Sequence, residues 1–495
     1  MSRRAWLAVA AVVILANAAK FVYLDADFPR GLTTSRALYT DEGWYSMNAV
    51  NAATGKPWYS AGEWNTAINL PVGPLLQTGV FHIFGTSLAS ARGLVAAASV
   101  LLVGAAFGLG RLYLPGPSAS LLAVLLSLDF FLFGYARLAI LDLTMTAVVM
   151  LAFWAAAAID VRRVLLAAML AGTLLGIAAL TKTTALCAVP ALAYLSSARV
   201  DDRRRRWLVA AFVLMPCGLI TLGYNLAAWH AFPSDYLAFH AFAEGEGLAS
   251  GPLDALRNAG LAFVNMVRAE PVVATLALAT VALLRRSAAF RANLLVRASV
   301  VWILAFVVML AFRNYQPSRY FVVVAVPLHI LFCAGTGHLA DLPVPAWFGQ
   351  TARAIAVGGL VGLNAGRIVG YVTDPSYSFV TMAREVAAIV NHPAGDRGSG
   401  VLLGDMAPSL SIERRISATS MGHTPEGLAA QIVRHCPTYF ITLESDRGHD
   451  VHALSEYYAV EPVGHWNVLG NYYEGRPVRL FRLHARGLTP LCDHS

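Results

Sequence analysis

An acidic pair followed by aromatic residues, Asp41-Glu42-Gly43-Trp44-Tyr45, stands in the first long polar segment after an apolar N-terminal run. A carboxylate just outside a membrane can take a proton from a nucleophile at the level of the lipid headgroups, which is general base chemistry. The pair also has a simpler interpretation, because Thr40-Asp41-Glu42 is a favourable helix start and loop charges are normally solvated. The pair alone leaves both interpretations open.

Three more ionisable residues, Asp142, Lys182 and Arg319, stand at the ends of apolar runs, where a charge is costly and commonly functional. Carboxylates beside cationic side chains suit a site that removes a proton and binds an anionic leaving group. Each residue also has a structural alternative. Asp142 could pair with Arg137 five residues earlier, Lys182 could extend to the headgroups, and Arg319 with Tyr320 could anchor the interface.

His240 lies in a polar segment between apolar runs and is the one candidate metal ligand. Acidic residues stand nearby, but their spacing is not that of a known metal motif, and a packed histidine is the alternative. We therefore assign no cofactor and keep a divalent metal ion at His240 as a candidate.

The composition indicates a polytopic membrane protein, since 57% of the 495 residues are hydrophobic and only 13% are charged. The net charge of +8 comes from arginines clustered between apolar runs, which is typical of membrane topology and not of nucleic-acid binding. Cys436 and Cys492 lie in the polar C-terminal part, where they form a disulfide in an oxidising compartment or stay as two thiols.

Hydropathy and arginine placement predict an all-α fold with about 11 to 13 transmembrane helices. A first span over residues 5–24 leads to a long external loop over residues 25–70. If Asp41 and Asp142 both lie outside, one of the next three apolar segments does not cross the membrane. Those segments are 68–85, 93–113 and 118–136, and further spans follow at 140–159, 164–181, 183–198, 207–230, 270–284, 298–312, 320–340 and 351–372.

Beyond residue 374 the apolar character falls, which separates a transmembrane module, 1–374, from a soluble extracytoplasmic domain, 375–495. Strands are predicted over Gly400–Gly404 and Thr438–Leu443, with a helix over Thr424–His435 between them. The tail is therefore predicted to be a small α/β domain.

In order and spacing, the motifs over residues 1–340 resemble membrane glycosyltransferases of the GT-C fold. These motifs are the Asp-Glu pair with aromatics, Arg137-Leu138 with Asp142 four residues on, Leu180-Thr181-Lys182, and Gln316 with Arg319-Tyr320. The resemblance is to the branch of protein O-mannosyltransferases and lipid A aminoarabinose transferases, families 39 and 83.

The resemblance implies sugar transfer from a polyprenyl-phosphate donor to a lipid, glycan or protein acceptor, at the outer face of the membrane. The high content of Ala, Arg and Gly favours a bacterial inner membrane with the site on its periplasmic or extracellular side. Transfer by a single displacement would invert the anomeric carbon. Asp41 would be the general base with Glu42 beside it, and Asp142 a second acid. The lipid phosphate would be held by Lys182, Arg319, Tyr320 and Arg137. Membrane lipids are the other partners, and nucleic acid is not one.

The sequence departs from this family at Ile68–Pro74, which carries no basic residue where relatives often have Lys or His before two prolines. This departure leaves open an inactive relative that acts as an assembly partner. A transporter or lipid flippase is the other alternative, although such proteins usually place charges near the middle of the membrane and have internal repeats. The sugar, the acceptor and the oligomeric state do not follow from the sequence.

Overall fold

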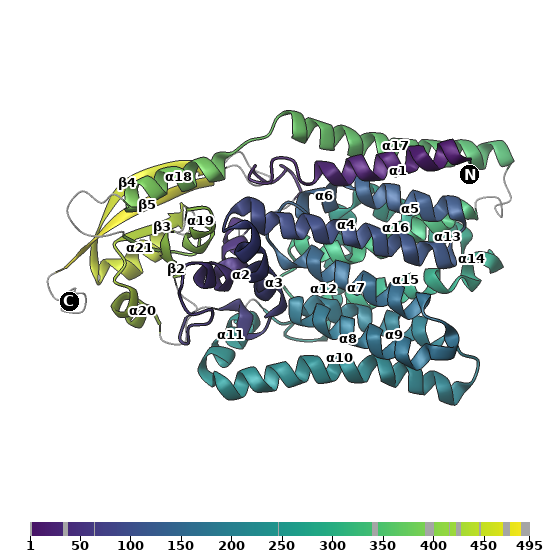
Figure 1. Cartoon of the computed structure of the whole chain (residues 1–495), viewed down its shortest axis with the longest axis horizontal. Coiled ribbons are helices and arrows are strands. Elements are labelled where there is room, and N and C mark those ends of the chain that lie inside the picture. The colour runs from purple at the N-terminus through teal and green to yellow at the C-terminus, as the bar shows by residue number, and fades with distance from the viewer. Residues whose placement is uncertain are drawn as a thin grey trace.

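The computed structural model describes residues 2–32, 38–63, 65–245, 247–338, 345–391, 400–414, 416–421, 427–444, 447–468 and 476–486. A helical bundle makes up most of the molecule, and a domain containing a β-sheet lies at one end of it (Figure 1). The bundle contains α1 (Arg3–Ala19), α2 (Leu38–Ala53), η1 (Thr66–Ile68), α3 (Val72–Phe84), α4 (Leu88–Tyr113), α5 (Gly116–Leu128), α6 (Phe130–Tyr135), α7 (Leu141–Ala158), η2 (Val161–Arg163), α8 (Val164–Thr181), η3 (Thr183–Ala188), α9 (Val189–Ser197), α10 (Arg203–Ala231), α11 (Pro233–Gly245), α12 (Pro252–Ala269), α13 (Pro271–Leu284), α14 (Ala288–Ala292), α15 (Leu294–Ala311), η4 (Ser318–Phe321), α16 (Val322–Gly337) and α17 (Ala346–Thr373).

Within the described ranges, seven helical segments are long and apolar enough to cross a membrane, and the bent pair α12–α13 would make an eighth. The seven include α4, α7, α8, α10, α15, α16 and α17. Our predicted number of about 11 to 13 spans is higher. The difference arises because apolar segments counted from the sequence fold as the shorter helices α3, α5 and η3–α9, and because the first predicted span folds as the 17-residue α1, which is not among the candidate spans.

If Asp41 and Asp142 lie on the same side of the membrane, one of the three apolar segments between them does not cross it. The helix α3 is the candidate for that segment. With 13 residues, this helix is about 20 Å long, which is too short for a hydrocarbon core of about 30 Å. It lies close to α2 at the end of the bundle that faces the sheet domain (Figure 1). Because α5 also has 13 residues, length alone does not choose between the segments, and it is the position of α3 from which we infer that 68–85 does not cross.

The C-terminal domain is built on a mixed five-stranded sheet with the order β2-β1-β3-β5-β4. β1 pairs in parallel with β2 and β3, whereas β5 is antiparallel to β3 and β4. This confirms the predicted strands near 400 and 440 and the helix before the second one. The domain contains α18 (Ser378–Asn391), β1 (Val401–Leu403), α19 (Ala407–Arg414), β2 (Ser417–Thr419), α20 (Gly427–His435), β3 (Tyr439–Leu443), α21 (Arg447–Ser455), β4 (Tyr458–Val468) and β5 (Arg476–Ala485).

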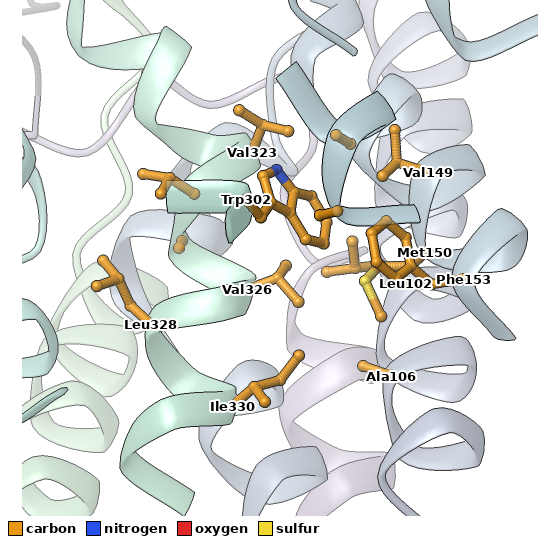
Figure 2. Close-up of a cluster of buried hydrophobic side chains, with 14 of the residues drawn as sticks. Leu102, Ala106, Val149, Met150, Phe153, Trp302, Val323, Val326, Leu328 and Ile330 are labelled. Atoms are coloured by element: carbon orange, nitrogen blue, oxygen red, sulfur yellow. The ribbon is translucent and has the colours of Figure 1, made fainter. Parts of the chain in front are cut away.

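A continuous apolar core joins α4, α7, α15 and α16 inside the bundle (Figure 2). Phe153 of α7 stacks on Trp302 of α15 with 4.7 Å between ring centroids, and Val323 and Val326 of α16 lie beside the indole. Close packing of large side chains leaves little freedom for one helix to shift against another. This core therefore fixes the start of α7, which carries Asp142, relative to η4, which carries Arg319.

A second apolar core crosses from the bundle into the C-terminal domain. It contains Tyr39 and Val50 of α2 together with Phe379 of α18 and Leu410 of α19. The rings of Tyr39 and Phe379 stack with their centroids 4.6 Å apart. The helix α2 is therefore packed between the bundle and the C-terminal domain, as its place in Figure 1 also shows.

Candidate functional site

Asp41 lies in the first turn of α2 and its side chain is buried, with 4% of the residue exposed. One of its oxygens, Oδ2, lies 2.8 Å from Nη1 of Arg319 in η4. The alternatives of a solvated loop charge at Asp41 and a lone interface anchor at Arg319 are therefore wrong. The two residues form a buried ion pair between segments 278 positions apart in the sequence (319 minus 41).

A second buried ion pair joins Asp142 and Lys182. Lys182 Nζ donates to Asp142 Oδ2 at 2.6 Å, and both side chains are almost fully buried. Asp142 stands in the first turn of α7, and Lys182 caps the C-terminus of α8 in an extended conformation. The proposed alternatives of an Asp142–Arg137 pair and a lysine that extends to the headgroups do not form.

Three tyrosine rings surround the two cations. Lys182 Nζ lies 5.7 Å from the ring centre of Tyr45 and 5.1 Å from that of Tyr320. The guanidinium of Arg319 lies 5.8 Å from the ring of Tyr315 and 5.6 Å from that of Tyr320. Tyr320 thus contacts both cations, and cation–π attraction of this kind is stronger where water is excluded.

The charges in this cluster act on one another. Burial raises the pKa of Asp41 above its ordinary value of 3.8, although the nearby Arg319 and Lys182 oppose the rise and Asp142 adds to it. Burial and the charge of Asp41 also raise the pKa of the Tyr45 hydroxyl well above 10.0, so this hydroxyl keeps its proton. Asp41 is thus a better proton acceptor than a solvated aspartate. We refer to Asp41, Asp142, Lys182 and Arg319 as the four-residue cluster.

Asp142 has one carboxylate oxygen that does not take part in its pairing with Lys182. Oδ1 is buried and accepts no hydrogen bond from the parts of the chain that the structure describes. A buried carboxylate oxygen without a donor is costly, so it is suited to accept a hydrogen bond from a bound molecule.

Glu42, which we predicted to be catalytic beside Asp41, is engaged in structural contacts. Its two carboxylate oxygens each accept a hydrogen bond of 2.8 Å from Arg92 of α4, and Oε1 also accepts from the backbone N–H of Ala139 at 2.7 Å. Arg92 in turn donates to the carbonyls of Leu24 and Ala26. Glu42 thus ties α2 to α4 and to the chain before α7.

Arg137, predicted to bind the lipid phosphate, instead makes hydrogen bonds to the backbone after α1. Its guanidinium donates to the backbone carbonyls of Lys20, at 3.1 Å, and Tyr23. It also lies 4.8 Å from the ring centre of Tyr371 in α17. Arg137 therefore fixes the chain after α1, and we do not include it in the proposed phosphate site.

His240, the candidate metal ligand, packs in α11 against the ring of Tyr236 with 4.3 Å between centroids. Its acidic neighbour Asp235 accepts hydrogen bonds from the Tyr59 hydroxyl at 2.7 Å and from the Gly62 N–H at 3.1 Å. Across the described ranges, no three His, Cys, Asp or Glu side chains come together as metal ligands. The metal at His240 stays a prediction, and the residues present give it no further support.

Two buried polar features are not predicted by the sequence. The first is Arg92, whose only signal was an arginine at the start of a long apolar run. The second is a buried polar contact in which His329 Nε2 of α16 lies 3.2 Å from Asp129 Oδ2, at the junction of α5 and α6. The suggested Cys436–Cys492 pairing lies outside the described residues because Cys492 does, so it stays a prediction.

The fold matches solved membrane enzymes over nearly the whole chain. ArnT from Cupriavidus metallidurans, solved with undecaprenyl phosphate bound, is 14% identical and superposes with a TM-score of 0.63 over 97% of this chain and 98% of that one. The Archaeoglobus fulgidus oligosaccharyltransferase, solved with Zn and sulfate, is 12% identical with a TM-score of 0.56, over 94% of this chain and 72% of that one. The chain is thus a multi-pass membrane protein with the GT-C fold.

Within that class, residues 68–228 match the family model for dolichyl-phosphate-mannose-protein mannosyltransferases. A sequence comparison with curated proteins gives no match. The resemblance to GT-C glycosyltransferases seen in the motifs is thereby confirmed, by a family model over one third of the chain and by the fold over almost all of it.

Proposed function

We propose that the protein transfers a sugar from a polyprenyl-phosphate carrier to an acceptor hydroxyl or amine at the outer face of a bacterial inner membrane. The observation that carries this proposal is the four-residue cluster, in which two carboxylates and two cations from four helical elements are buried together. The family match and the undecaprenyl phosphate bound by the ArnT of similar fold agree with a lipid-phosphate donor.

The proposed reaction is a single displacement. The acceptor oxygen or nitrogen forms a bond to the anomeric carbon, while the bond from that carbon to the phosphate oxygen breaks on the opposite face. The bonding electrons leave with the polyprenyl phosphate, and the acceptor proton moves to the carboxylate of Asp41. Inversion at the anomeric carbon follows from this geometry.

The two cations of the cluster would stabilise the polyprenyl phosphate as a leaving group. A phosphate that departs gains negative charge, and fixed cations in a site without bulk water stabilise that charge strongly. Arg319 and Lys182 are the cations available in the cluster, and Arg319 offers two parallel N–H groups to a phosphate. Tyr320, which contacts both, would keep them in place.

Binding of the donor would also activate the base. In the resting site Arg319 pairs with Asp41 and opposes the rise in the pKa of that carboxyl. If the donor phosphate pairs with the guanidinium of Arg319, the ionised Asp41 is stabilised less by that positive charge. Its pKa then rises, and Asp41 becomes a stronger base. Asp142 would meanwhile accept a hydrogen bond through its available Oδ1 and orient the sugar or the acceptor.

We assign no step of this mechanism to a metal, since Asp41 and Asp142 each pair through Oδ2 with Arg319 and Lys182. Glu42 is placed in this proposal as a positioning residue, through its bonds to Arg92 and Ala139. A divalent ion would need ligands beyond those that the described residues bring together.

The test of this function is transfer of labelled sugar in membranes that contain the protein, from a panel of polyprenyl-phosphate sugars. We expect one donor to support transfer that membranes without the protein do not show. Protein-dependent movement of the lipid across the membrane without transfer would favour a flippase, and neither activity would favour an inactive assembly partner.

The orientation of the protein in the membrane can be tested separately. A cysteine introduced at the exposed Glu456, in the C-terminal domain, should react with a membrane-impermeant maleimide in intact spheroplasts. A cysteine at the exposed Asp201, in a basic segment at the other end, should react only after permeabilisation. The reverse result would place the site on the cytoplasmic side.

A further inference from the structure

The turn of α2 that carries Asp41 and Glu42 is contacted directly by the C-terminal domain. Ser409 of α19 is completely buried, and its hydroxyl accepts a hydrogen bond of 2.9 Å from the N–H of Gly43 and donates to the carbonyl of Tyr39. Tyr39 and Gly43 are four residues apart, so these two groups face each other within one turn of an α-helix. A single serine hydroxyl thus contacts both ends of the turn that contains the acidic pair.

The approach of α19 to this turn is unusually close. A Cβ atom on Gly43 would lie 2.2 Å from the backbone nitrogen of Ser409 and 2.7 Å from the carbonyl carbon of Pro408. Real Cβ atoms do not approach backbone atoms so closely, and a backbone cannot turn aside as a flexible side chain can. The glycine after the acidic pair is therefore required by contact with the C-terminal domain.

The carboxylates hold the other side of the same turn to the bundle. Asp41 pairs with Arg319 of η4, and Glu42 pairs with Arg92 of α4. Side chains that insert beside the backbone hydrogen bonds of a helix locally change its path. The position of the Asp41 carboxylate relative to the two cations thus depends on both parts of the molecule.

We propose that the C-terminal domain positions the catalytic base and that Ser409 is the positioning residue through which it does so. This inference rests on the proposed function for its effect on transfer, but the positioning itself is a statement about geometry. It gives the C-terminal domain a role in building the active site.

The experiment compares Ser409→Ala with Ser411→Ala in the full-length protein. Ser411 is a suitable control because it is also buried in α19, while its hydroxyl donates to the carbonyl of Pro408 in its own helix, at 2.6 Å. We expect Ser409→Ala to lower kcat about ten- to a hundredfold, as small displacements of reacting groups do, with donor affinity close to that of the wild type. Ser411→Ala should keep the wild-type kcat, and Ser409→Thr, which retains the hydroxyl, should recover part of the loss.

A second measurement does not depend on activity. Cryo-EM structures of the wild type and Ser409→Ala should show a changed turn from Tyr39 to Gly43 and a changed Asp41–Arg319 separation. An unchanged turn overturns the proposal, and so does a wild-type kcat in Ser409→Ala. If the wild type transfers no sugar, the proposed function fails, and the two structures alone decide whether Ser409 positions Asp41.

Discussion

For the single residues of the cluster, burial and charge oppose each other. Asp41 and Arg319 would each be costly if buried alone, and their pairing makes burial tolerable without removing the rise in the pKa of Asp41. The same holds for Asp142 and Lys182, whose pairing leaves one carboxylate oxygen available. The site is thus charged and nearly dry, which suits chemistry that develops an anion.

A pH profile tests the environment of Asp41. Only the ionised carboxylate can accept a proton, so kcat/KM should fall toward acid pH with a midpoint above 3.8, the ordinary carboxyl pKa, because burial raises the pKa of Asp41. The measurement is kcat/KM against pH, with the folded fraction followed in parallel.

The raised pKa of Asp41 lowers activity in acid but increases the stability of the folded protein there. A carboxyl whose pKa is higher in the folded than in the unfolded protein stabilises the fold in acid, and this contribution is lost as the pH rises through the folded pKa. Activity that falls in acid while the protein stays folded therefore fits titration of Asp41. An acid limb at or below the ordinary carboxyl range, or one that follows unfolding, would contradict this assignment.

At the scale of elements, the termini of helices bring the chemistry together. Asp142 begins α7, Lys182 ends α8 and Arg319 lies in η4 before α16, so each charge stands where a packed helix starts or stops. The apolar core between α7, α15 and α16 fixes these ends relative to one another (Figure 2). The fourth member, Asp41, depends instead on α2 and on the polar contacts that hold α2.

The Arg92–Glu42 pair should contribute strongly to the stability of the folded protein, because it joins α2 to α4. Arg92→Leu would leave a buried carboxylate without its partner, and such losses destabilise by about 3–5 kcal/mol. Replacing both residues with leucine removes the uncompensated charge, so the double variant should be more stable than Arg92→Leu alone. The measurement is reversible unfolding in detergent, and equal stability of Arg92→Leu and the wild type would contradict this role.

Much of the four-residue cluster was predictable from the sequence because hydropathy assigns each charge to a side of the membrane. Apolar runs and arginine clusters predict that Asp41, Asp142, Lys182 and Arg319 all lie on one side, and this prediction needs no knowledge of their partners. The roles of Glu42 and Arg137 were not predictable in this way, since their partners Arg92 and the carbonyls near Tyr23 are distant in sequence. Local spacing also gave no indication that Ser409, in another domain, contacts the turn of Asp41.

At the scale of the whole molecule, α2 is where the two parts of the chain meet (Figure 1). The bundle supplies the cations and Asp142, while the C-terminal domain packs on α2 through Phe379 and Ser409. The division at residue 374 remains a useful prediction for the chain, but the site as we propose it is built from both sides of that boundary. We therefore expect activity to require the intact molecule.

The proposed role of Asp41 as the general base is tested by comparing sugar transfer by the purified wild type with transfer by Asp41→Asn. Asparagine keeps the shape of the side chain but cannot accept the acceptor proton at neutral pH, so transfer should fall by about two to four orders of magnitude. Binding of the polyprenyl-phosphate donor that supports transfer by the wild type should persist, since Arg319 and Lys182 remain. Transfer at the wild-type rate in a folded Asp41→Asn protein would contradict the account.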